Sequence, residues 1–372
     1  MISLADAHIL ELPQYVPGKS IKEASLEYGV QKLIKLASNE NPWGPSPLAL
    51  KEIEKSLCFG HLYPNTGRRE VKERICHHHE NFNLEPENIV LGNGANELIM
   101  LLVRAFVGQD QKVVNAWPSF IVYSLAAQTH QREEIRVPLT VQLDYDLPAM
   151  LEVIKKNSAQ VKLVFIANPN NPTGRYLSKA ALDNFIAELP DHVIIAVDEA
   201  YGEFVDDEDY GTIVDWIKKR PRVVVLRTFS KIFGLAGFRL GYAICEREMA
   251  EILHRVREPF NVNCAALFAA HGALDDIEHV RKTKNNNSLE RVRVRAELLK
   301  MGLQVTVSSA NFLLVHLSAD CLKSADQVIN ELIYHGVIVR PVDSYEIENA
   351  FRVTIGQPQE NDQFLKALTA II

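Results

Sequence analysis

Cysteine is scarce in this sequence, and the few cysteines are irregularly spaced. The 372 residues contain five of them, an odd number, and no C-x-x-C pair occurs. A disulfide framework or a zinc ribbon needs paired or closely spaced cysteines. The sequence therefore argues against both, and it predicts a reducing compartment and no metal site. The five residues are Cys58, Cys76, Cys245, Cys264 and Cys321.

Long apolar runs and an excess of positive charge are also missing. No window approaches the uninterrupted apolar length of a membrane helix. The first 18 residues carry two acids and neither lysine nor arginine, which is not the pattern of a signal peptide. The formal net charge is −7, so the bulk field does not attract DNA, RNA or an anionic membrane. We therefore expect a cytoplasmic protein that binds neither nucleic acid nor membrane.

The rest of the composition is that of a large globular protein. Hydrophobic residues make up 47% of the chain and charged residues 23%, a balance typical of soluble folds. From about residue 46, short apolar runs alternate with amphipathic stretches. A helix is predicted at 95–106 and strands at 88–91, 112–115, 161–167, 193–197, 223–226 and 240–245. This alternation predicts an α/β fold in which helices cover both faces of a sheet.

The pattern changes after about residue 250 to one typical of an α+β domain. A charged helix is predicted at 285–300 and a second helix at 325–335, with strands at 304–307, 312–316, 337–340 and 351–355. The chain is too long for one ordinary core. We expect an N-terminal arm (1–35) that joins the small domain, a large domain (36–255) and a small C-terminal domain (256–372).

Lys231 is the first candidate for chemistry. It lies in R-T-F-S-K, directly after a predicted buried strand, and ligands bind at the carboxyl ends of strands in α/β sheets. Schiff-base chemistry needs a neutral, partly desolvated amine. A phosphate-bearing cofactor needs hydroxyls and a guanidinium, which Thr228, Ser230 and Arg239 offer. Taken alone, this lysine would more simply be a solvated loop residue.

A second strand end carries acids. Asp198 and Glu199 follow the predicted strand at 193–197, and Tyr201 lies close behind. A carboxylate at this place can pair with a pyridine nitrogen and keep it protonated, which makes the ring an electron sink. The alternative for Asp198 is an ordinary helix N-cap.

The string T-F-S-K-x-F-G-L-A-G-x-R-x-G-Y resembles the cofactor-lysine motif of the fold-type I pyridoxal-5′-phosphate (PLP) aminotransferases, which have a mixed, mostly parallel sheet. The resemblance implies that Lys231 holds PLP as a Schiff base and carries the proton, and that Thr228, Ser230 and Arg239 bind the cofactor phosphate. In the similar D-E-A-Y motif, Asp198 pairs with the pyridine nitrogen. Tyr201 would hydrogen-bond the ring oxygen O3′.

Further motifs are similar in the family's order, from Asn39 to Gly356. N-P-N-N-P-T-G implies that Asn168 donates its amide to O3′. W-P-S-F implies that Phe120 stacks on the cofactor ring. L-G-N-G-A-N-E resembles a second phosphate cradle. The alternatives are a plain Asn/Pro/Gly loop, a core phenylalanine and a common strand–glycine–helix turn. The cradle residues are Gly94, Ala95 and Asn96.

Three motifs concern substrate and partner. S-N-E-N-P-W-G-P-S-P, which contains Asn41, resembles the substrate loop of the histidinol-phosphate aminotransferases within this family. In their Y-P segment the tyrosine, here Tyr63, reaches the cofactor phosphate of the other subunit, which implies a homodimer. F-R-V-T-I-G implies that Arg352 binds substrate. Arg340 is a second anion contact or, equally, a structural ion pair.

The resemblance implies transamination of L-histidinol phosphate with 2-oxoglutarate, a small amino donor and a 2-oxo acid. The products are imidazole-acetol phosphate and glutamate, and the step belongs to histidine biosynthesis. An aromatic amino-acid aminotransferase and a threonine-phosphate decarboxylase are the alternatives on the same scaffold. A PLP-domain transcription regulator would need a helix-turn-helix domain, for which the 38 residues before Asn39 are too few and not basic.

Overall fold

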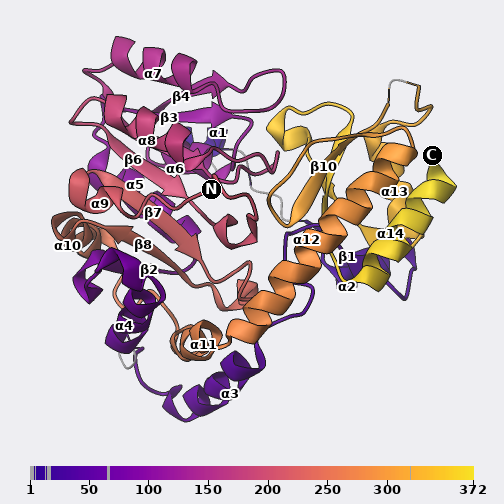
Figure 1. Ribbon diagram of the computed structural model, residues 1–372, viewed down its shortest axis with the longest axis horizontal. Coiled ribbons are helices and arrows are strands. Elements are labelled where there is room, and N and C mark those ends of the chain that lie inside the picture. Colours follow the sequence, from indigo (N-terminus) through magenta and orange to yellow (C-terminus); the bar gives the residue numbers. More distant parts are fainter. Residues whose placement is uncertain (1–3, 5, 13, 15–17, 65–67, 319) are drawn as a thin grey trace.

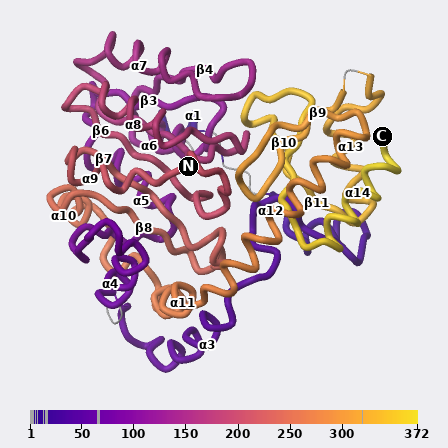
Figure 2. The backbone as a smooth tube through the Cα atoms, in the orientation of Figure 1, coloured from indigo at the N-terminus to yellow at the C-terminus, as the bar shows by residue number. Residues whose placement is uncertain are grey.

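The computed structural model describes residues 4, 6–12, 14, 18–64, 68–318 and 320–372. Figure 1 shows two bodies, a larger one built on a twisted sheet and a smaller one beside it, with helix α12 (Ile277–Lys300) running between them. Figure 1 shows α2 (Ile21–Tyr28) and β1 (Ile34–Lys35) along the smaller body, and the tube in Figure 2 shows α1 (Ala7–Glu11) over the larger one. His8 of α1 lies 2.6 Å from the side-chain nitrogen of Gln131 in the larger body. Within the described residues, no helix has the length and apolar character needed to cross a membrane.

The larger body contains a seven-stranded sheet. Strand β8 runs antiparallel to both of its neighbours, β2 and β7. The five strands from β7 to the far edge at β4 run parallel to one another. The predicted mixed, mostly parallel sheet is therefore confirmed. The order across the sheet is β2 (Ile89–Gly92), β8 (Gly241–Cys245), β7 (Val223–Thr228), β6 (Ile194–Asp198), β5 (Val161–Ala167), β3 (Lys112–Trp117) and β4 (Glu133–Pro138).

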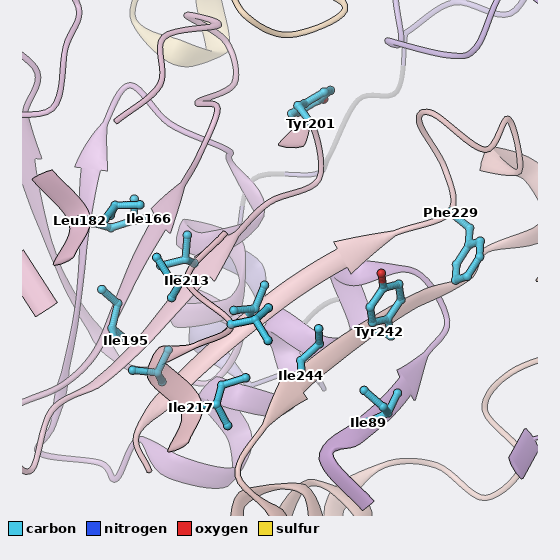
Figure 3. Close-up of a cluster of buried hydrophobic side chains, with 14 of the residues drawn as sticks. Ile89, Ile166, Leu182, Ile195, Tyr201, Ile213, Ile217, Phe229, Tyr242 and Ile244 are labelled. Atoms are coloured by element: carbon cyan, nitrogen blue, oxygen red, sulfur yellow. The ribbon is translucent and has the colours of Figure 1, made fainter. Parts of the chain in front are cut away.

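Both faces of this sheet are buried, because successive strand residues point to opposite sides and both sets are apolar. In β5, Leu163 and Phe165 belong to one core and Val164 and Ile166 to the other. The first core is completed by α5 (Ala95–Phe106), α6 (Val122–Thr129) and α10 (Arg247–Val256). Figure 3 shows part of the second core, which includes side chains of α4 (Arg68–His78), α7 (Leu147–Lys156), α8 (Lys179–Glu188) and α9 (Trp216–Lys219).

Strand β4 was not predicted from the sequence. It is the edge strand of the sheet and reads E-E-I-R-V-P, and only Val137 within it is buried. The other residues of β4 are exposed or half-buried, so this strand lacks the apolar signal of a buried one.

The smaller body contains an antiparallel sheet in the order β12 (Arg340–Pro341), β13 (Ala350–Thr354), β10 (Phe312–His316) and β9 (Gln304–Val305). The helices α12, α13 (Ala325–Tyr334) and α14 (Pro358–Ile371) pack with it around a separate apolar core. The N-terminal segment contains α1 (Ala7–Glu11), α2 (Ile21–Tyr28) and β1 (Ile34–Lys35). Strand β1 pairs in parallel with β11 (Val337–Ile338), which attaches this segment to the smaller body.

Helix α11 (Cys264–Asp275) bears on the domain boundary. Its buried alanines belong to the core of the larger body, and it packs closely on α3 (Pro47–Ser56). A Cβ at Gly272 would lie 2.3 Å from the carbonyl oxygen of Leu48, so glycine permits this close approach. We propose that the chain divides into an arm, a large domain and a small domain, with the second boundary near the start of α12 rather than at residue 255.

Candidate active site

The carboxyl ends of β5, β6 and β7 open onto a cavity of about 390 Å³. The smaller body and the segment at 37–40 form its other walls. Open α/β sheets bind ligands at this edge because strand ends and helix N-termini meet there. Among the residues that line it are Ala95, Asn96, Phe120, Asn171, Asp198, Tyr201, Thr228, Ser230, Lys231, Arg239, Arg340 and Arg352.

Lys231 lies in the loop after β7 and is partly exposed to this cavity. Its Nζ donates to the carbonyl oxygen of Ser38 over 3.2 Å and lies 5.5 Å from the ring centre of Tyr201. Desolvation, helped by the cationic Arg352 and Arg239, lowers the pKa of Lys231 to about 7. A substantial fraction of this amine is therefore neutral, and nucleophilic, near neutral pH.

Asp198 ends β6, the strand next to β7. One carboxylate oxygen accepts the main-chain N–H of Ala200 over 3.1 Å, and the other accepts the hydroxyl of Tyr123 over 3.0 Å. Burial raises the pKa of Asp198 to about 6, although both hydrogen bonds and the charge of Lys231 oppose that rise. The cavity thus has a desolvated carboxyl group and a desolvated amine on adjacent strands.

The side wall is polar. The Tyr201 hydroxyl accepts a hydrogen bond from Asn39 Nδ2 over 2.9 Å. Arg352 donates through Nη1 to Asn171 Oδ1 and through Nη2 to the carbonyl oxygen of Ala37. Its Nε is buried and has no hydrogen-bond partner among the described residues. A buried guanidinium with an unused donor is suited to an anionic ligand.

An anion cradle forms where α5 begins. Gly94 has a φ of 79°, and a Cβ there would lie 2.5 Å from Nη2 of Arg239. A Cβ at Gly241 would lie 2.5 Å from the main-chain nitrogen of Ala95. Two glycines therefore allow a guanidinium, a helix N-terminus and strand β8 to converge. Together with the hydroxyls of Thr228 and Ser230, this group is suited to a phosphate.

Two predicted residues, Asn168 and Asn41, are not among those that line the cavity. The Asn168 side chain does not line the cavity, because its Nδ2 and Oδ1 are both bound to the main chain of Leu177, over 3.1 and 2.7 Å. Asn171, three residues on, lines the cavity instead. Both asparagines precede a proline, so the pattern alone does not tell which one turns inward.

Asn41 is the second of these residues. Its Nδ2 donates to the carbonyl oxygen of Ile232 and to Thr283 Oγ1, and its Oδ1 accepts the N–H of Trp43. It holds its own loop against the larger body and α12 and is not among the residues that line the cavity. Asn39, in the same loop, lines the cavity and donates to the Tyr201 hydroxyl.

Tyr63 lies outside the cavity of its own chain. Its side chain is 78% exposed, and its ring stacks on that of Phe260 with centroids 4.7 Å apart. Two adjacent, exposed aromatic rings are a feature of protein interfaces. This position is compatible with the predicted reach into a second subunit, which stays a prediction.

These positions fit PLP. An acid (Asp198) suits the ring nitrogen, an amine (Lys231) suits the aldehyde carbon, Tyr201 suits O3′, and the cradle beside Arg239 suits the phosphate. Fold and site together define a PLP-dependent enzyme of fold type I.

The comparisons with known proteins define the family. Residues 31–368 match the model of aminotransferase class I and II, and the chain belongs to this family. It is 40% identical to a histidinol-phosphate aminotransferase of Anaeromyxobacter sp. (strain Fw109-5), with 99% of each chain covered. It is also 40% identical to histidinol-phosphate aminotransferase 1 of Mannheimia succiniciproducens, with 99% of this chain and 98% of that protein covered.

A solved structure agrees with these sequences. The crystal structure of histidinol-phosphate aminotransferase from Sinorhizobium meliloti in complex with pyridoxal-5′-phosphate has a TM-score of 0.88 and is 25% identical. The match covers 99% of this chain and 97% of that one. PLP is accordingly the cofactor of this chain's family, and the chain is a PLP-dependent aminotransferase.

The lowered pKa of Lys231 has a measurable consequence. Apoprotein mixed with PLP should take it up covalently at a rate that rises as the amine loses its proton, half-maximally near pH 7. An unperturbed lysine would titrate at roughly pH 10.4. Stopped-flow absorption at constant ionic strength measures this rate. A rate that keeps rising beyond about pH 9 would show that the lysine is not desolvated, and Lys231→Ala is the control that should show no covalent uptake.

Proposed function

We propose that this protein transfers the amino group of L-histidinol phosphate to 2-oxoglutarate, giving imidazole-acetol phosphate and glutamate in histidine biosynthesis. One structural observation supports this chemistry most directly. Asp198 ends β6, Lys231 follows the adjacent strand β7, and both line one cavity beside the anion cradle. The choice of substrate is supported by the relatives, which are named histidinol-phosphate aminotransferases and are 40% identical over nearly the whole chain.

Each reacting residue has a defined task. When bound, PLP supplies an electron sink that stabilises negative charge at the Cα of the amino donor. Asp198 would hold a proton on the ring nitrogen, and Tyr201 and Asn171 would hydrogen-bond the ring oxygen. Lys231, freed when the donor amine takes its place, would move the proton between Cα and C4′. Phe120, at the cavity wall, would stack on the ring.

The cations of the smaller body would serve both substrates. Histidinol phosphate carries a phosphate and 2-oxoglutarate carries two carboxylates, so each half-reaction brings an anion to the same place. Arg352 has the unused buried Nε described above, and Arg340 also lines the cavity. A fork-shaped guanidinium binds either anion through two hydrogen bonds.

The subunit arrangement and location are proposals too. We propose a homodimer in which Tyr63 reaches the cofactor phosphate of the other subunit, which its exposure and its stacking on Phe260 support. We also propose a cytoplasmic location, with small molecules rather than nucleic acid or membrane as partners. All five cysteines are free thiols, which is compatible with a reducing compartment.

A panel of substrates tests the proposed reaction. Purified holoenzyme should give the highest kcat/KM with histidinol phosphate and 2-oxoglutarate, above phenylalanine or tyrosine by at least about tenfold. The reason is charge: a phosphate brings nearly two negative charges to the guanidinium groups of Arg352 and Arg340, and the carboxylate of an aromatic amino acid brings one. Glutamate formation is the readout. A higher kcat/KM with phenylalanine would indicate an aromatic aminotransferase. Carbon dioxide release from threonine phosphate without any oxo acid would indicate a decarboxylase.

Mixing two inactive variants tests the shared site. Tyr63→Ala and Lys231→Ala proteins should each be weakly active or inactive alone. In a hybrid dimer one site has Lys231 from one chain and Tyr63 from the other, so activity should return after the two are unfolded and refolded together. Size-exclusion chromatography confirms that dimers re-form. If the re-formed dimers are no more active than the parents, the tyrosine acts within its own chain or not at all.

A further inference from the structure

Tyr123 contacts Asp198 from outside the cavity lining. It belongs to α6, its side chain is fully buried, and it is not among the residues that line the cavity. Its hydroxyl donates to Asp198 Oδ2 over 3.0 Å. No other side chain among the described residues is recorded as donating to this carboxylate, whose second hydrogen bond comes from the main chain of Ala200.

The ring of Tyr123 is held on two sides. It stacks on Phe165 of β5 with centroids 4.7 Å apart and planes 4° from parallel. It also makes a T-shaped contact with Phe120, with ring centroids 5.6 Å apart and an angle of 86° between the ring planes. This packing fixes the hydroxyl with respect to β6, since β5 and β6 are neighbours in the sheet. The direction of the Asp198 carboxylate is therefore set by a rigid aromatic cluster.

The packing around position 123 would suit any apolar ring. Only the Asp198 carboxylate gives a reason for the hydroxyl of a tyrosine there. The neighbours of Tyr123 on α6, Val122, Ala126 and Ala127, are apolar and buried. Phenylalanine would fill the same space, and a buried hydroxyl without a partner would be costly. The hydroxyl is thus explained by Asp198.

Other ionisable groups surround Asp198. Lys231, which follows the adjacent strand, lowers its pKa, and Glu199, the next residue, raises it. Glu199 is itself paired with Arg227 over 3.2 Å and accepts the hydroxyl of Thr212. Three tyrosines also lie within electrostatic reach, each with a pKa raised by burial, and so stay neutral: Tyr145, Tyr201 and Tyr210.

We propose that Tyr123 is a positioning residue that keeps Asp198 ionised and aimed at the ring nitrogen of the cofactor. The proposal rests on the proposed function, because it concerns the acid that function assigns to the ring nitrogen. A hydrogen bond donated to a carboxylate favours its charged form. Without it, burial would protonate Asp198 at a higher pH, and a neutral acid holds the ring nitrogen's proton less firmly.

The test compares two variants that each lose one buried hydroxyl. Tyr123→Phe removes the donor to Asp198. Tyr145→Phe is the matched control, because the Tyr145 hydroxyl donates to the carbonyl oxygen of Ala167 and not to Asp198. In Tyr123→Phe, the acid limb of kcat/KM and of the bound cofactor's visible absorption should move up by about one to two pH units. The value of kcat should fall while KM changes little, and Tyr145→Phe should keep the wild-type limb.

The outcomes separate the proposals. An unshifted acid limb in Tyr123→Phe, or an equal shift in Tyr145→Phe, overturns the role of Tyr123 and leaves the proposed function standing. Wild-type protein that binds PLP and does not transaminate overturns the proposed function itself. Thermal unfolding of both variants shows whether they fold. If Tyr123→Phe does not fold, Tyr123→His takes its place, because the ring N–H of histidine can also donate a hydrogen bond. Tyr123→His should keep the wild-type acid limb, and a shifted acid limb in that variant counts against the proposal.

Discussion

The chemistry of the site depends on the desolvation of one carboxyl group and one amine, which lie at the ends of two adjacent strands. Asp198 ends β6, and Lys231 follows β7, its parallel neighbour. Burial moves both groups toward neutrality, raising the pKa of Asp198 to about 6 and lowering that of Lys231 to about 7. In water these two groups would be ionised at all pH values between about 4 and 10. The fold thus prepares the amine for attack and makes the charge of the acid dependent on its surroundings.

The rest of the fold maintains this arrangement. Apolar side chains on both faces of the sheet hold β6 and β7 in place. The aromatic cluster of Tyr123, Phe165 and Phe120 holds the Asp198 carboxylate through the Tyr123 hydroxyl. Two glycines let the phosphate cradle close around Arg239. The smaller body contributes Arg352, whose charge also lowers the pKa of Lys231. The site therefore needs both bodies, and neither contains all of its walls.

The sequence predicted the parts of the fold whose signal is local. Strand β5 and helix α5 have the predicted bounds, because a short buried apolar run and a 12-residue segment with apolar residues at helical spacing are both local signals. The edge strand β4 was missed because it is mostly exposed. Helix α11 was assigned to the small domain, and only tertiary packing on α3 places it with the larger body.

The same distinction holds within the site. Lys231, Asp198 and Arg239 were found because they directly follow strands or belong to long motifs, and all three line the cavity. Asn168 and Asn41 are not among the residues that line it, whereas Asn171 and Asn39 are. The direction of a loop side chain depends on hydrogen bonds to distant residues, such as Leu177 or Thr283, which the sequence pattern does not contain. Tyr123 carried no motif, and its role emerges only from its contact with Asp198.

A crystal structure of the protein with PLP bound is the most direct measurement of the central claim. The account predicts that one ring spans the cavity, with its nitrogen within hydrogen-bond distance of the Asp198 carboxylate and its C4′ carbon bonded to Lys231 Nζ. It also predicts the phosphate between the start of α5 and Arg239. Electron density for a ring that meets only one of these two side chains, or that lies outside this cavity, would contradict it.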